Sequence, residues 1–61
     1  MTFKEFMEMN TGTPPLFEAV YKGKVFYWPE SVNKPKLQDR EVEAFEIYSG
    51  PQEPFCKVYL K

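Results

Sequence analysis

The sequence contains no histidine and a single cysteine, Cys56. Without histidine the commonest general base near neutral pH is absent, and metal sites lose their usual nitrogen ligand. One cysteine cannot form an internal disulfide, and a structural zinc site normally needs four cysteine or histidine ligands. We therefore expect no metal, no cofactor and no intrachain disulfide in this protein.

The sequence also lacks a clear excess of charge of either sign and any long apolar run. Eight Lys and Arg residues against nine Asp and Glu residues give a formal net charge of -1. This balance disfavours strong non-specific binding to nucleic acid, and it also disfavours a heavily acidic DNA mimic. No stretch approaches the roughly 20 apolar residues of a membrane span, and the first residues lack the apolar run of a signal peptide. We expect a cytoplasmic protein that binds no membrane.

The residues that usually carry chemistry offer no catalytic constellation. The three glycines, Gly12, Gly23 and Gly50, lie far apart, so no glycine-rich phosphate loop exists. The carboxylate pairs within residues 41–46 are best explained as a solvated strand edge rather than as a general acid and base. Cys56 lies in an alternating apolar segment, where we expect a small buried residue rather than a reactive thiol. We predict that the protein is not an enzyme.

Aromatic residues are abundant, with six Phe, four Tyr and one Trp among 61 residues. Each can bury roughly 150–250 Å². A chain of this length buries only about 60% of the surface that its unfolded form exposes. An aromatic-rich sheet of this size is left with an apolar patch, which favours a partner protein or self-association.

Two local patterns predict the elements of the first half of the chain. Thr2 and Glu5 have the spacing of a capping box, which predicts a helix over residues 3–9 with Phe3 and Phe6 on its apolar face. Residues 16–28 alternate around Lys22-Gly23 and predict a hairpin. The expected register sets Tyr21 opposite Lys24, Ala19 opposite Phe26 and Phe17 opposite Trp28.

Residues 29–40 form a polar connection in which Val32 and Leu37 are the only apolar anchors. We interpret this segment as a surface loop, and its length also makes it a candidate contact surface. Its cations, Lys34, Lys36 and Arg40, could add an electrostatic contact.

Residues 40–49 are compatible with a helix or a strand, and we favour the strand because it pairs well with the alternating segment that follows. A hairpin over residues 41–61 sets Ile47 opposite Cys56 and Phe45 opposite Val58 on an apolar face. The other face matches Glu46 with Lys57 and Ala44 with Tyr59. The terminal strand is expected at an edge of the sheet, where it could accept a further strand.

The predicted fold is a single α+β domain over residues 1–61. A short N-terminal helix packs on a three- or four-stranded antiparallel sheet made of two hairpins.

Protein binding is the function that best uses these features. We predict a small non-enzymatic module that binds another protein or itself. In size and style the chain resembles the small accessory proteins of phages and mobile elements, which implies binding and modulation of a larger protein in the host cytoplasm. A structural subunit of an assembly is a second form of this hypothesis. The residues predicted to contact the partner are Val20, Val25, Tyr27, Phe55, Tyr59, Lys34 and Lys36.

The alternative function is binding of single-stranded nucleic acid. Lys22, Lys24, Phe26 and Trp28 interleave lysines with aromatics, as a base-stacking platform would. The likeness to the basic-glycine-aromatic signature of RNA-binding sheets is faint, because the alternation differs and the second half-motif is missing. Nucleic acid is therefore the less favoured partner.

Overall fold

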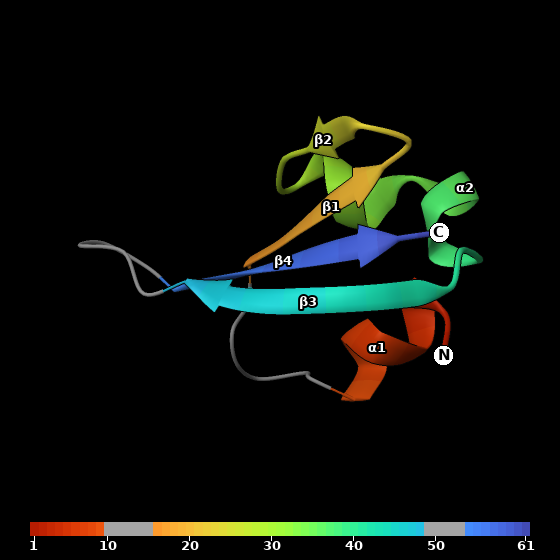
Figure 1. The fold of residues 1–61 in the computed structure, drawn as a ribbon, viewed down its shortest axis with the longest axis horizontal. Coiled ribbons are helices and arrows are strands. Elements are labelled where there is room, and N and C mark those ends of the chain that lie inside the picture. The colour runs from red at the N-terminus through yellow and green to blue at the C-terminus, as the bar shows by residue number, and fades with distance from the viewer. Residues whose placement is uncertain (10–15, 49–53) are drawn as a thin grey trace.

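The computed structural model describes residues 1–9, 16–48 and 54–61, which form a four-stranded sheet with helices on one face (Figure 1). In chain order the elements are α1 (Phe3–Met9), β1 (Leu16–Tyr21), β2 (Lys24–Phe26), the 3-10 helix η1 (Glu30–Asn33), α2 (Pro35–Gln38), β3 (Val42–Tyr48) and β4 (Phe55–Leu60). Among the described residues, no helix is both long enough and apolar enough to span a membrane.

The sheet has the strand order β2-β1-β4-β3 and is mixed. Within each hairpin the strands are antiparallel, as predicted. The two hairpins meet through β1 and β4, which run parallel over six residue pairs. The α+β class is confirmed, whereas the purely antiparallel sheet is wrong at this junction. The terminal strand β4 is consequently internal, and the edges of the sheet are β2 and β3.

The registers of both hairpins follow from the alternation of apolar residues. Ala19 pairs with Phe26 in the first hairpin, and Phe45 and Ile47 pair with Val58 and Cys56 in the second. These pairs confirm the prediction, including the strand rather than the helix over the residues before Ser49. The turn of the first hairpin has φ values of 51° at Lys22 and 77° at Gly23, which is the two-residue turn that suits the twist of a hairpin.

The first hairpin is shorter than predicted. Strand β2 ends at Phe26, so the expected pair of Phe17 with Trp28 is wrong, and Trp28 is 49% exposed. The hydroxyl of the buried Ser31 donates a hydrogen bond to the carbonyl oxygen of Phe17. The 3-10 helix η1 therefore lies beside this part of β1 in place of a continued strand. The Trp28–Pro29 peptide bond is cis.

The connection between the hairpins is structured rather than a plain loop. It contains η1 and α2, and Pro35 occupies the first turn of α2, where a missing N–H costs nothing. Leu37 is fully buried and Val32 packs against the core. Both predicted anchors are thus confirmed.

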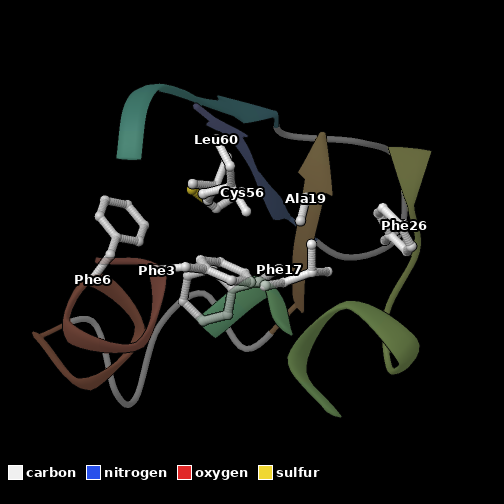
Figure 2. Packing of buried hydrophobic residues seen from close by; sticks show 9 residues of the cluster. Phe3, Phe6, Phe17, Ala19, Phe26, Cys56 and Leu60 are labelled. Atoms are coloured by element: carbon white, nitrogen blue, oxygen red, sulfur yellow. The ribbon is translucent and has the colours of Figure 1, made fainter. Parts of the chain in front are cut away.

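The hydrophobic core lies between the helices and one face of the sheet (Figure 2). The capping box is present, since the Thr2 amide donates to Glu5 Oε1 at 2.8 Å and the Glu5 amide donates to Thr2 Oγ1 at 3.2 Å. It starts α1 so that the rings of Phe3 and Phe6 meet Phe17 edge to face, with ring centres 6.4 and 6.0 Å away. The buried apolar residues are Phe3, Phe6, Phe17, Ala19, Phe26, Leu37, Cys56, Val58 and Leu60.

Candidate binding surfaces

The sheet face opposite the core, called here the open face, has no helix on it among the described residues. The register brings Val20 beside Val25 on one side and beside Tyr59 on the other. Phe55, which pairs with Leu16, lies on the same face. All four predicted residues are half-buried. The structure therefore gathers these four members of the predicted set on one surface.

The other members of the predicted set lie elsewhere. Tyr27 follows the end of β2 and is 63% exposed. The ammonium nitrogens of Lys34 and Lys36 lie 5.9 and 5.8 Å from the ring centre of Phe26, a residue of the core face. The two lysines thus belong to the helical side of the molecule, and the predicted set divides between two surfaces.

Side-chain contacts tie β3 to β4 on the open face. The Tyr59 hydroxyl donates to Glu46 Oε1 at 2.7 Å. This bond, with the nearby negative charge and some burial, raises the pKa of Tyr59 to about 12. Next to it the rings of Tyr48 and Phe55 stack with centres 5.0 Å apart. These contacts hold β3 against β4. They leave the other side of β3, which faces away from β4, uncovered.

Two apolar side chains on the core face of β3 are exposed to water, although side chains on this face of the sheet are otherwise mostly buried. Phe45 is 51% exposed and Ile47 is 61% exposed, although their cross-strand partners Val58 and Cys56 are buried. Helix α1 has seven residues and is therefore only about 10 Å long. Phe6 brings its ring centre within 5.0 Å of that of Phe45, but both side chains of β3 remain largely open to water. The alternation of apolar residues predicted that both side chains lie on the apolar face, but it did not predict their exposure.

The backbone of β3 also lies at an edge of the sheet. Its start is covered, because Thr2 pairs with Glu41 and the Val42 amide donates to the Met1 carbonyl oxygen at 2.8 Å. A register shift between Val42 and Ala44 follows. Beyond it, no described strand lies on the outer side of residues 44–48. We call residues 44–48, with the exposed side chains of Phe45 and Ile47, the β3 edge.

Reactive groups are few in the described part of the chain. Within residues 1–9, 16–48 and 54–61, no group of three His, Cys, Asp or Glu side chains is placed to hold a metal ion. Cys56 is 2% exposed and unpaired, and burial raises the pKa of its thiol. A raised pKa lowers the thiolate fraction that a nucleophile needs.

The aromatics of the alternative nucleic-acid hypothesis differ in exposure. Phe26 is 3% exposed, so a base cannot stack on its ring, whereas Trp28 is 49% exposed. The comparisons with known proteins add no family: no protein-family model matches the chain, and neither the curated proteins nor the solved structures gave a match.

Proposed function

We propose that the chain is a non-enzymatic protein-binding module whose contact surface is the β3 edge, continued by the open face. The observation that carries this proposal is the exposure of Phe45 and Ile47, at 51% and 61%, on a strand that lies at a sheet edge. Exposed apolar side chains and an uncovered strand edge on the same element are typical of a surface that accepts another chain.

Strand addition would use both features of the β3 edge. An incoming extended segment pairs with the outer backbone groups of residues 44–48, which gives affinity without requiring a particular sequence. Its alternate side chains cover Phe45 and Ile47 on the core face or contact Tyr48 on the open face. Since β3 itself carries Glu43 and Glu46 and no cation, a neutral or basic partner strand fits better than an acidic one.

The open face would extend this contact. Val20, Val25 and Tyr59 form a row across three strands next to the stacked pair of Tyr48 and Phe55. We infer a role in which the module occupies a surface of a larger protein in the cytoplasm, as small accessory proteins of phages and mobile elements do, or forms a subunit of an assembly.

The test compares three tagged proteins: the wild type, the double variant Phe45→Ser/Ile47→Ser, and the control Met9→Ser. Met9 is apolar and 70% exposed but lies on α1, so the control removes an exposed apolar side chain outside the proposed surface. Each protein is used for affinity capture from cell extract and for analytical ultracentrifugation over a concentration series.

We expect the wild type and the Met9→Ser control to retain the same partner or to self-associate, and the double variant to lose this behaviour while remaining folded by circular dichroism. A wild type that stays monomeric and retains no protein would contradict the proposal. Equal retention by all three proteins would contradict the placement of the contact at the β3 edge.

A further inference from the structure

Lysines gather around the ring of Phe26 at the opposite edge of the sheet from β3. The ammonium nitrogens of Lys24, Lys34 and Lys36 lie 5.0, 5.9 and 5.8 Å from its ring centre. These distances are within the range of cation–π attraction. Figure 2 shows Phe26 at one end of the core, away from the rings of Phe3 and Phe17. The ammonium groups of three lysines, one from β2 and two from the start of α2, thus converge on this buried ring.

A second ring extends this group of cations. The Arg40 guanidinium carbon lies 4.9 Å from the ring centre of Tyr21, and Lys22 Nζ lies 5.4 Å from it. Tyr21 pairs directly with Lys24 across β1 and β2, so the two groups are continuous. We call the five residues Lys22, Lys24, Lys34, Lys36 and Arg40 the basic cluster. They are five of the eight cations in the sequence.

Compensation of this charge within the described residues is incomplete. Glu30 pairs with Lys34 at 3.3 Å, and Asp39 precedes Arg40 in the chain. No other side-chain carboxylate of the described ranges forms an ion pair with the cluster, and Arg40 Nε donates a hydrogen bond to the backbone oxygen of Lys61 at 3.0 Å. Three ammonium groups that converge on one ring repel each other, and a bound anion relieves that repulsion. The net charge of -1 conceals this local excess, because the fold places many carboxylates elsewhere.

Two exposed aromatic residues lie next to Phe26 along the backbone. Tyr27 and Trp28 follow Phe26 directly in the chain and are 63% and 49% exposed. Since consecutive Cα atoms are 3.8 Å apart, both lie within about 8 Å of Phe26 along the backbone. Surfaces that bind single-stranded nucleic acid combine two components. Cations contact the phosphates, and aromatic rings stack on the bases.

We propose that the basic cluster, with Tyr27 and Trp28, is a binding site for single-stranded nucleic acid. The ammonium and guanidinium groups contact the phosphates, and the two aromatic rings stack on bases. Phe26 holds the lysines in place and does not itself stack. The exposed rings of Tyr27 and Trp28 favour nucleic acid over an acidic protein segment. The carboxylates of an acidic segment would need only the cations, whereas a nucleic acid also has bases that stack on the rings. This site is separate from the β3 edge and does not depend on the function proposed for that edge.

The experiment titrates the full chain with a dye-labelled deoxythymidine oligomer of about 12 nucleotides, a length within the range of single-strand binding sites of small folds. Fluorescence anisotropy of the dye reports binding. Fluorescence of Trp28, the single tryptophan of the chain, reports stacking. Each titration is repeated between about 50 and 200 mM salt, because release of counterions makes phosphate binding depend on salt.

We expect saturable binding with quenching of Trp28. If all five cations contact phosphates, the slope of log K against log salt approaches about -3.5, at roughly -0.7 for each phosphate of a single strand. The variant Lys34→Gln/Lys36→Gln should lower the magnitude of this slope by about 1.4. The control Lys4→Gln/Lys57→Gln removes the same charge outside the cluster and should leave the slope unchanged.

Three results would overturn the proposal. The first is no binding at the lowest salt. The second is an equal loss of affinity for the oligonucleotide in both double variants, which would show general charge attraction rather than binding at a defined site. The third is binding without any change in Trp28 fluorescence together with equal affinity for polyglutamate, which would assign the cluster to acidic protein segments instead.

Discussion

Replacing Ile47 by serine separates what this side chain contributes to folding from what it contributes to binding. Ile47 is 61% exposed, so folding buries only about four tenths of it. Complete burial of an isoleucine side chain is worth about 1.5–3 kcal/mol, so the variant should lose about 0.6–1.2 kcal/mol of unfolding free energy. The fully buried Leu37 provides the comparison, since Leu37→Ala should cost about 2–5 kcal/mol.

The part of Ile47 that stays exposed in the folded protein is available to a partner. Burying these remaining six tenths is worth about 0.9–1.8 kcal/mol, which corresponds to a roughly 5- to 20-fold weaker Kd for the serine variant. Ile47→Ser is therefore predicted to affect binding at least as strongly as it affects folding, whereas a core variant affects folding first.

Urea unfolding followed by circular dichroism measures the first effect for the wild type, Ile47→Ser and Leu37→Ala. Sedimentation or titration calorimetry with the captured partner, or with the protein itself if it self-associates, measures the second effect. If Ile47→Ser destabilised the fold as much as Leu37→Ala does, the Ile47 side chain would be buried in solution, which contradicts its exposure on the β3 edge. An unchanged Kd would refute the part that concerns binding.

Three further predictions concern the turn, the phenol and the thiol. Gly23 has φ +77° and space around its Cα for a methyl group, so Gly23→Ala should cost about 1–2 kcal/mol in urea unfolding through backbone conformation alone. The hydrogen bond of Tyr59 to Glu46 requires the protonated phenol, so its stabilisation is present below pH 10 and is lost as the pH rises toward 12. A spectrophotometric titration should find this one tyrosine with a pKa of about 12, and Glu46→Gln should lower that pKa. Cys56 is buried, so thiol reagents should modify it only as fast as the protein unfolds, and rapid modification of the folded protein would contradict its placement.

The elements that could be predicted from the sequence depend on neighbours close along the chain. The capping box of Thr2 and Glu5 marks the start of α1, and the alternation around Lys22-Gly23 sets the register of the first hairpin. In the second hairpin the alternation alone placed Phe45 opposite Val58. Each of these patterns is satisfied by contacts within a few residues or across one hairpin, so tertiary packing had little to change.

The arrangement of the hairpins could not be predicted in the same way. Nothing local specifies that β1 pairs with β4, because both strands are apolar on one face and could have joined other neighbours. Strand β2 ends at Phe26, and beside Phe17 the place of a continued strand is taken by η1, whose Ser31 hydroxyl donates a hydrogen bond to the Phe17 carbonyl oxygen. Both features depend on contacts between segments far apart in the sequence.

The candidate surfaces were predicted in part. Alternation correctly gathers Val20, Val25, Phe55 and Tyr59 on one sheet face, and their role as binding residues stays a prediction. The exposure of Ile47 was missed, because it depends on how far a short helix reaches over a four-stranded sheet.

The basic cluster was not predicted, because composition gives the total charge of the chain and not the distribution of that charge over the folded surface. The net charge is a sum over the whole chain, whereas the cations of the cluster come from the first hairpin and from the connection that follows it. These segments come together only in the fold, where Lys34 and Lys36 reach the ring of Phe26 and Arg40 reaches the ring of Tyr21.

Addition of another chain to the β3 edge is tested most directly by amide hydrogen exchange on the free and the partner-bound or self-associated protein. Strand addition supplies acceptors for outward backbone N–H groups of residues 44–48, so exchange there should slow markedly on binding. Amides of β2, at the other edge of the sheet, serve as the internal control and should exchange at an unchanged rate. Protection confined to β2 or to the helices, with exchange across residues 44–48 unaltered, would contradict strand addition at the β3 edge.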